Sequence, residues 1–196
     1  IPNESNAMKF HKLTSEERFE LLFLRSFVKN TMDIHLRIMD NKKKNLNYKY
    51  VGSLNRMLNY LLYFLCGKEN LIKEGDAEEI LEEVEPIAKR QMMLRDIGLI
   101  DILVKICYLP LRLHNIALTT RTQTIVTLKQ TMSSTYDCIK YSVAEYRPNE
   151  LYLSQWLGLF IEDTFKNNSN VLEKAESTLK ELIDNNEKIL RDRIDK

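Results

Sequence analysis

The chain has 196 residues, which is enough to bury the core of one domain or of one block of a longer repeat protein. Only 5 Gly and 4 Pro residues punctuate it, while 44% of the residues are hydrophobic and 29% are charged. This balance is typical of a soluble helical protein and excludes most all-β folds. The net charge of +1 gives no general attraction to nucleic acid or membranes, so any anion site must be a local cluster of cations. No apolar run approaches the ~18 residues of a membrane span.

The first seven residues do not share the helical pattern of the rest of the chain and are left out of the fold prediction. Ser5, Asn6 and Ala7 precede Met8 and resemble the scar left when an expression tag is cleaved. The start also has neither the charged region nor the apolar region of a signal peptide. We therefore expect residues 1–7 to be a tag remnant and residues 8–196 to form a single α-helical domain.

The first helix is predicted to begin at Thr14. Thr14 and Glu17 have the spacing of a capping box, and apolar residues follow at helical intervals to about Met39. Residues 41–50, NKKKNLNYKY, break this pattern. They are predicted to form a solvated loop between helices, with a contact to an acidic partner as the alternative.

A second helix is predicted over residues 51–66, because leucines recur on a broad face and Gly67 follows its end. Asp76 and Glu79 repeat the capping-box spacing, which predicts a short acidic helix facing solvent. Pro86 then suits the first turn of a further helix that continues to residue 97.

Residues 90–110, RQMMLRDIGLIDILVKICYLP, predict two helices joined at a glycine. Apolar residues lead up to Gly98, and others follow it at helical spacing. Residues 151–165 repeat this pattern around Gly158. We expect both glycines to lie at tight joints between helices, where a side chain would be costly. Two such joints indicate an all-α, armadillo-like α-solenoid, a class of helical bundle that usually positions partners.

The rest of the chain predicts one loop and three more helices. Proline disfavours helical backbone at the residue before it, so the helix that begins at Thr124 is expected to stop near Pro148. The predicted segments are a loop over residues 112–122, a helix from Thr124 to near Pro148, a helix capped by Asn170 and running through Leu182, and a last helix over residues 187–194.

The residue types that usually carry chemistry are scattered. His11, His35 and His114 have no Cys or carboxylate at ligand spacing, which argues against a metal site. No phosphate-binding glycine loop and no serine nucleophile motif appears. We therefore expect no enzyme activity, no catalytic residue, no cofactor and no metal. The cysteines are odd in number and lie in apolar helical patterns, so we interpret them as reduced core thiols of a cytosolic protein; they are Cys66, Cys107 and Cys138.

Three blocks resemble, in order, one family: the domain shared by ryanodine receptors and inositol trisphosphate receptors, called the RIH domain. The central block is the most specific, because the family has an Arg-Gln pair, a glycine and an aliphatic helix in the same order. The resemblance covers most of the chain from about residue 53. The blocks are LNRMLNYLLYFLCG at residues 54–67, RQMMLRDIGLIDILVKICYLP at residues 90–110, and residues 136–194, which contain YDCIKYSVAEYRPNE and LKELIDNNEKILRDRI.

The resemblance implies a cytosolic piece of a tetrameric calcium-release channel in the endoplasmic reticulum membrane. In the family, this α-solenoid follows β-trefoil domains and relays ligand-driven movement to the pore. In inositol trisphosphate receptors it also supplies one wall of the ligand site, with cations on one helix and a Tyr-Arg-Lys run on a second region. The corresponding positions here are Ala88, Met92, Arg95, Tyr146, Arg147 and Pro148.

Three of the five positions that are basic in the family are thus neutral in this chain, and Ala, Met and Pro give phosphate no charged donor. We expect a regulatory domain on the cytoplasmic face of the endoplasmic reticulum membrane, acting by contact with neighbouring domains or subunits. It would bind no nucleic acid and would not insert into the membrane. In this interpretation Arg95 and Arg147 are ion-pair residues at the surface or between domains.

Two alternatives stay open. One is a residual inositol phosphate half-site made by Arg95, Tyr146 and Arg147, with weak or lost binding of inositol trisphosphate. The other is an unrelated armadillo-type scaffold that binds a peptide in a concave groove.

Overall fold

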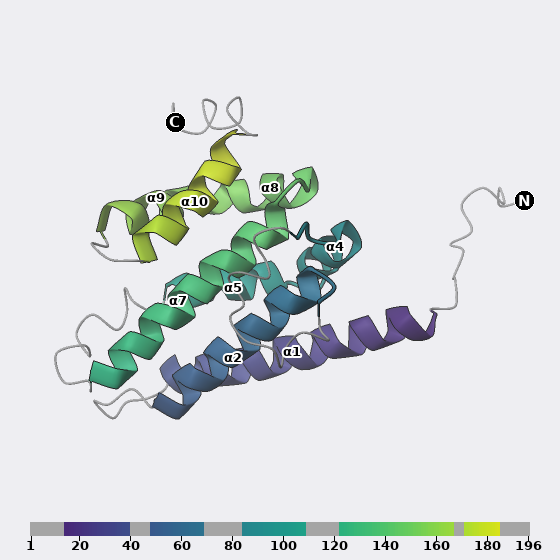
Figure 1. Ribbon diagram of the computed structural model, residues 1–196, viewed down its shortest axis with the longest axis horizontal. Coiled ribbons are helices and arrows are strands. Elements are labelled where there is room, and N and C mark those ends of the chain that lie inside the picture. Colours follow the sequence, from purple (N-terminus) through teal and green to yellow (C-terminus); the bar gives the residue numbers. More distant parts are fainter. Residues whose placement is uncertain (1–13, 40–47, 69–83, 109–121, 167–170, 185–196) are drawn as a thin grey trace, which may run out of the picture.

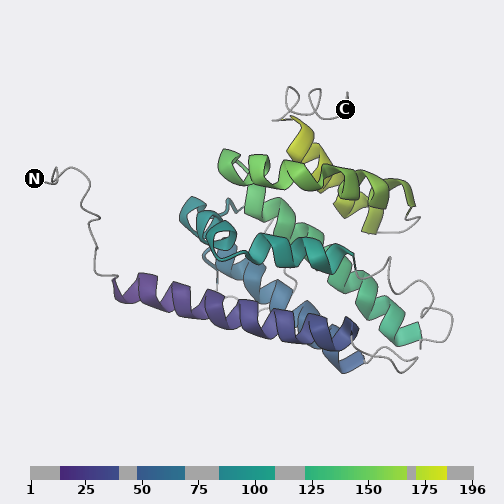
Figure 2. The ribbon, with the colours of Figure 1, turned by 180° about the vertical axis from the view of Figure 1, so that it is seen from behind.

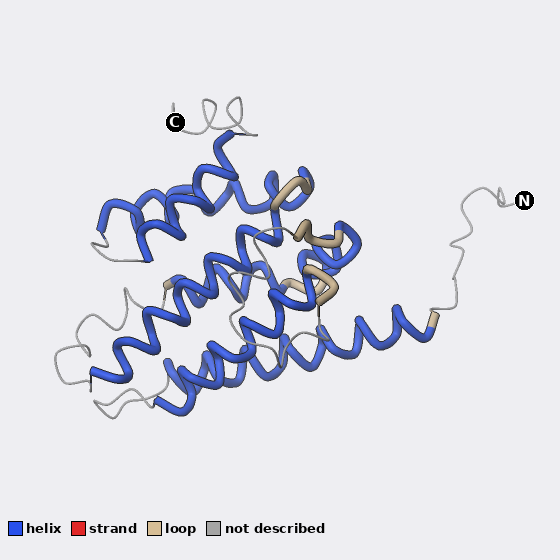
Figure 3. The backbone as a smooth tube through the Cα atoms, in the orientation of Figure 1, coloured by secondary structure: helices blue, strands red, loops and turns tan. Residues whose placement is uncertain are grey.

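The computed structural model describes residues 14–39, 48–68, 84–108, 122–166 and 171–184, and Figure 3 shows that they form helices without any strand. This confirms the all-α prediction. The elements labelled in Figure 1, together with one short 3-10 helix, are α1 (Ser15–Met39), α2 (Tyr48–Leu65), α4 (Ala88–Asp96), α5 (Leu99–Cys107), α7 (Thr122–Val143), α8 (Arg147–Leu153), η4 (Ser154–Trp156), α9 (Leu157–Lys166) and α10 (Val171–Asp184).

The start of α1 carries the reciprocal cap that its sequence predicts. The Thr14 backbone N–H donates to Glu17 Oε2 at 2.9 Å, and the Glu17 backbone N–H donates to Thr14 Oγ1 at 3.1 Å. Lys89 Nζ donates to Glu17 Oε1 at 3.0 Å. The Thr14 backbone bond and then the lysine hold the pKa of the Glu17 carboxyl below its usual value. A carboxylate in this position also complements the positive end of the helix dipole.

The end of α2 confirms the predicted role of Gly67, which has a φ of 65°. The Lys68 N–H donates to Tyr63 O at 2.9 Å and the Gly67 N–H donates to Phe64 O at 3.2 Å, which is the pattern of a Schellman motif. The helix starts at Tyr48, so it includes the last three residues of the predicted loop. The remainder of that loop lies outside the described residues.

Ile87 closes the connection between α2 and α4. Its N–H donates to Leu65 O at 2.9 Å, and a Cβ added at Gly67 would come within 2.9 Å of Ile87 Cδ1. Ile87 is held extended, with φ −83° and ψ 112°, so α4 begins only at Ala88. Pro86 therefore lies before the helix, and the prediction that it occupies the first turn is wrong.

The helices stack in one order from α1 to α10 (Figure 1). α1 packs against α2, α2 against α7, and α7 against α10, which also packs against α9. Figure 2 shows the same order from behind, with α5 lying across α7. α1 is thus at one edge of the stack, and the pair of α9 and α10 is at the other.

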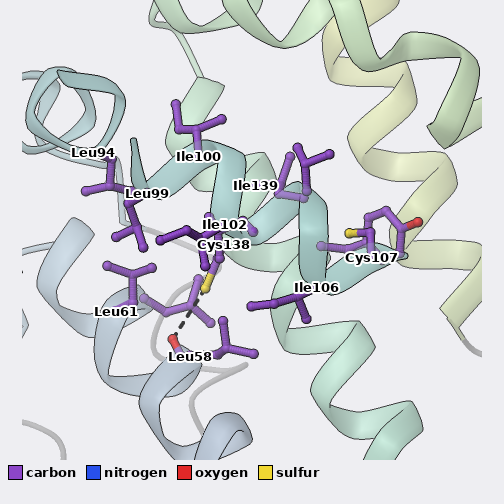
Figure 4. Packing of buried hydrophobic residues seen from close by; sticks show 14 of the residues in the cluster. Leu58, Leu61, Leu94, Leu99, Ile100, Ile102, Ile106, Cys107, Cys138 and Ile139 are labelled. Carbon is purple, nitrogen blue, oxygen red and sulfur yellow. Dashed lines mark hydrogen bonds between the residues drawn. The ribbon is translucent and has the colours of Figure 1, made fainter. Parts of the chain in front are cut away.

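Side chains from these layers meet in one hydrophobic core. Figure 4 shows its centre, where Leu58 and Leu61 of α2, Leu94 of α4, Leu99 of α5 and Cys138 of α7 converge. Cys138 Sγ donates to Leu58 O at 3.3 Å, which joins α7 to the backbone of α2. Because apolar burial is the main favourable term in folding, this shared core makes neighbouring helices depend on one another.

Gly98 forms the joint that its flanking sequence predicts. Its φ of 72° and ψ of 19° lie in the left-handed region, and α5 begins at the next residue. Its N–H donates to Arg95 O at 2.9 Å and so closes α4. An added Cβ would meet only Asp101 Oδ2, at 3.9 Å, so glycine is required by the backbone conformation and not by crowding.

Gly158 does not form a second joint of this kind, and that prediction is wrong. Gly158 lies in the first turn of α9 and has no positive φ. A Cβ added at this position would have no neighbouring atom within 4 Å. The chain turns just before it through η4, whose flanking residues Leu153 and Leu157 both keep right-handed helical angles. A 3-10 turn changes the helix direction without a left-handed residue, so no glycine is needed.

Replacing Gly98 by valine is expected to lower the free energy of unfolding by roughly 1–3 kcal/mol, because a β-branched residue is strained at positive φ. Urea unfolding of the whole chain measures this change. Gly158→Val is the matched control, and we expect it to change stability by no more than about 0.5 kcal/mol. Equal losses in the two variants would contradict the assignment of strain to Gly98.

The connection between α7 and α8 also departs from the prediction. α7 begins at Thr122, two residues before the predicted start, and ends at Val143. The chain then reverses at Glu145, which has a φ of 55°. Arg147 is the first residue of α8 and Pro148 follows it in the first turn, so the proline opens a helix instead of ending one. A first-turn residue needs no N–H donor, which is why proline fits there.

Several predicted segments lie outside the described residues: most of the acidic helix, the loop over residues 112–121, the Asn170 cap and the last helix. Two residues at the end of the predicted acidic helix, Val84 and Glu85, are described and are not helical. The helix predicted after Asn170 is present as α10.

Candidate functional site

The predicted inositol phosphate residues occupy two elements. Ala88, Met92 and Arg95 lie at i, i+4 and i+7 of α4 and so share one face of that helix. Ala88 is exposed and Met92 is 38% exposed. Tyr146 is the N-cap residue of α8, and Arg147 is the first residue of that helix.

Two buried amide side chains hold α4 against the end of α7 and the start of α8. Gln91 Nε2 donates to Tyr141 O and to Ala144 O, at 2.9 Å in each case. Asn149 Nδ2 donates to Gln91 O and to Ser142 O, at 2.8 Å in each case. A buried amide is stable only when it is paired, so these bonds fix how the helices meet. The two halves of the candidate site therefore lie on helices that are bonded directly to each other.

The two arginines of the candidate site each have a carboxylate neighbour. Arg95 NH2 lies 3.1 Å from Asp96 Oδ1, and Arg147 NH1 lies 3.1 Å from Glu150 Oε2. The Glu150 side chain is only 3% exposed. Each carboxylate offsets the positive charge that a phosphate would meet, so the site attracts anions less than two isolated arginines would.

A bond between a phenol and a carboxylate lies beside Arg95. Tyr152 Oη of α8 donates to Asp101 of α5, at 2.8 Å from Oδ1 and 2.9 Å from Oδ2. This bond is the main cause that raises the pKa of the Tyr152 hydroxyl, while the positive charge of Arg95 acts in the opposite direction. The bond ties α8 to α5, the helix that follows the Gly98 joint.

Replacing Tyr152 by phenylalanine is expected to lower the free energy of unfolding by about 1 kcal/mol, because the hydroxyl bonds a charged group but the pair is partly exposed. Chemical unfolding measures the change. Tyr60→Phe, on an exposed tyrosine of α2, is the control and should change stability little. Since the folded pKa of Tyr152 is raised, its bond to Asp101 contributes below pH of about 10 and is lost as the pH rises through the raised pKa.

The comparison with known families accounts for most of the chain. The family model of the RIH domain matches residues 55–196. The chain belongs to the RIH family. This confirms the resemblance carried by the three sequence blocks. A search of curated proteins and a search of solved structures give no match.

The match begins within α2, yet α1 is bound to the RIH region by a buried ion pair. Arg90 Nε donates to Glu20 Oε1 at 2.8 Å, and the residues are 9% and 5% exposed. Arg90 NH1 also donates to Phe64 O at the end of α2, and the guanidinium lies 4.3 Å from the centre of the Phe64 ring. Phe23 of α1 stacks on the Phe64 ring, and the centres of the two rings are 4.8 Å apart. Arg90 thus joins α1, α2 and α4.

Sequence reasoning missed the residues that make these junctions. Arg90 and Gln91 are the Arg-Gln pair of the most specific family block, so the pair was visible although its structural role was not. A charged and an amide residue within an apolar helical pattern are a signal for buried polar contacts. Glu20 and Asn149 are far from their partners in sequence, and no local pattern marks them.

The three cysteines of the RIH chain are buried and none is in a disulfide bond, as predicted. Burial raises the pKa of the Cys66 thiol to about 11, against a smaller opposite effect of Lys68, and burial raises the pKa of Cys138 well above its usual value. Protonated thiols are weak nucleophiles. Within the described ranges, no group of His, Cys, Asp and Glu side chains could hold a metal ion, and no helix is long and apolar enough to cross a membrane.

Proposed function

We propose that this RIH chain is an armadillo-like α-solenoid domain that regulates an intracellular calcium-release channel of the ryanodine or inositol trisphosphate receptor type. The family match over residues 55–196 is the observation that carries the proposal. The domain would lie on the cytoplasmic face of the endoplasmic reticulum membrane, as part of a larger channel. Family membership favours this function over that of an unrelated armadillo scaffold.

In the proposed mechanism the domain passes on movement as a nearly rigid body. Close-packed interiors resist continuous deformation, so a rotation imposed at one surface is transmitted to the opposite surface. The buried bonds of Arg90 and Gln91 support this mechanism, because they tie α4 to α1, α2, α7 and α8. A neighbour that pushes on α1 would thereby move α4 with it.

The domain would act by contact between domains and not by catalysis. The burial of Cys66 and Cys138 in the helical core is consistent with this part of the proposal, because neither thiol is open to a substrate. Its partners would be neighbouring domains or subunits of the channel.

A residual inositol phosphate half-site is the second candidate function. It is favoured by the contact between α4 and α8, which places the helix that carries Arg95 against the helix that begins with Arg147. The neutral residues Ala88 and Met92 on the same face of α4 weigh against strong binding. Binding would be weak in this chain.

The complete coding sequence of the parent gene tests the channel proposal. We expect β-trefoil domains before this region and membrane-spanning helices near the end of the parent protein. The full-length protein, expressed with a fluorescent tag, should then be located at the endoplasmic reticulum. A parent gene that encodes neither trefoil domains nor membrane spans would overturn the proposal.

A further inference from the structure

The outer face of α1 is an exposed surface at the edge of the stack. In Figures 1 and 2 the α9 and α10 pair covers the opposite edge, while the described helices that pack against α1 all lie on one side of it. Its inner face, which includes Leu24 and Phe27, is buried in the core. Its outer face contains the most exposed large apolar residues described, namely Phe19 at 67%, Leu22 at 58% and Leu36 at 53%.

Three exposed cations lie on the same outer face. Arg18, Leu22, Arg25, Lys29 and Leu36 follow one another at spacings of three, four and seven residues, so the five positions form one line along the helix. We name this line the α1 stripe. Phe19 lies beside its first turn.

The cations of the α1 stripe form no ion pair with a described carboxylate, whereas four other charged residues of α1 are paired. Glu17 pairs with Lys89, Glu20 pairs with Arg90, and Arg37 pairs with Asp33. These four charges are thus balanced within the domain. The outer face keeps three positive charges around two apolar side chains.

We propose that the α1 stripe binds an acidic amphipathic helix of a neighbouring domain or partner protein. The positive charge of the stripe favours a negatively charged partner. Its 3–4 spacing matches a helix lying alongside α1, with Leu22 and Leu36 packed between pairs of opposite charge. The inference rests on the proposed function, in which the domain acts by contact, and it adds the chemistry of one partner.

A lipid surface suits the α1 stripe less well. An interfacial membrane helix needs a broad apolar face with its cations at the margins. The broad apolar face of α1 is already buried against the core, and the cations of the stripe stand in the same line as Leu22 and Leu36. The stripe therefore favours a protein partner.

The test uses the full chain and a synthetic twenty-residue helix with Leu at positions a and d of each heptad and Glu at the flanking positions. Binding is measured by fluorescence anisotropy at two salt concentrations, because screening should weaken it. We expect the variant Arg18→Gln, Arg25→Gln, Lys29→Gln to weaken binding about tenfold or more. The variant Phe19→Ser, Leu22→Ser should weaken it as well. All these positions are exposed, so melting curves should show that both variants fold.

Lys105→Gln, Lys129→Gln, Lys180→Gln is the matched control, since it removes three exposed cations from α5, α7 and α10. It should leave binding of the Glu-Leu peptide nearly unchanged. Equal losses in the two charge variants, no binding of the peptide, or equal binding of a Lys-Leu peptide would each overturn the proposal. So would stronger binding to phosphatidylserine vesicles that depends on the α1 stripe. None of these outcomes bears on the parent gene, so the channel proposal is tested separately.

Discussion

Glu20→Ala is expected to lower the free energy of unfolding by about 3–5 kcal/mol, because it removes one partner of a buried ion pair in which Arg90 Nε and Glu20 Oε1 are 2.8 Å apart. The bond of Arg90 to Phe64 O and its contact with the Phe64 ring would remain, and a backbone carbonyl and an aromatic ring supply no full negative charge. Urea unfolding followed by circular dichroism measures the loss. The loss should appear in the whole chain, although Glu20 precedes the residues that the RIH model matches.

Two controls separate the buried pair from a general effect of α1. Glu17→Ala removes the exposed partner of Lys89 and one bond of the α1 cap. It should cost much less than Glu20→Ala, because solvent screens an exposed pair and a helix cap contributes less than a buried ion pair. Glu20→Leu combined with Arg90→Met removes both buried charges and should recover much of the stability lost in Glu20→Ala. If the double variant is no more stable than the single one, the ion pair does not account for the loss.

Restoring the family cations is expected to create measurable binding of inositol trisphosphate. Ala88→Arg, Met92→Lys and Pro148→Lys place three charges at exposed positions of α4 and α8, so the fold should tolerate them. Each new charge-assisted contact adds on the order of 1.5–3 kcal/mol at best. The unmodified chain should bind weakly or not at all. Calorimetry at low salt is the appropriate measurement, because screening would hide a weak anion site.

A control for charge alone accompanies this experiment. Asn30→Lys, Tyr60→Arg and Val126→Lys add the same charge at exposed positions of α1, α2 and α7, away from the candidate site. Pro148→Lys is also tested by itself, because the proline lies in the first turn of α8. Equal gains in both triple variants, or micromolar binding by the unmodified chain, would contradict the predicted site.

Short sequence motifs predicted several helix ends correctly, namely the capping box at the start of α1 and the glycines after α2 and α4. Thr14 with Glu17 gave the cap of α1, and Gly67 and Gly98 gave left-handed helix ends. Gly158 misled the prediction, because a glycine between apolar residues resembles a joint whether or not its φ is positive. Pro148 misled it as well, since proline is compatible with the start of a helix as much as with its end.

Contacts between distant residues could not be predicted in this way. Glu20 and Arg90 are 70 positions apart, and Gln91 and Asn149 are 58 apart. Helical periodicity indicates which face of a helix is buried but not which helix covers it. For the candidate site, the family resemblance named Arg95, Tyr146 and Arg147. The carboxylates beside the two arginines are local in the sequence, since Asp96 follows Arg95 and Glu150 lies three positions after Arg147, and the structure adds the geometry of the two pairs.

The closure made by Ile87 has a consequence for evolution and for protein engineering. Its bond to Leu65 O and its contact with Gly67 bring the chain together just before α4. A side chain at residue 67 would displace Ile87 and so strain the end of α2 and the start of α4 together. Substitutions at residues 67 and 87 should therefore be correlated among related genes, and an engineered change at one of them should be made together with a change at the other.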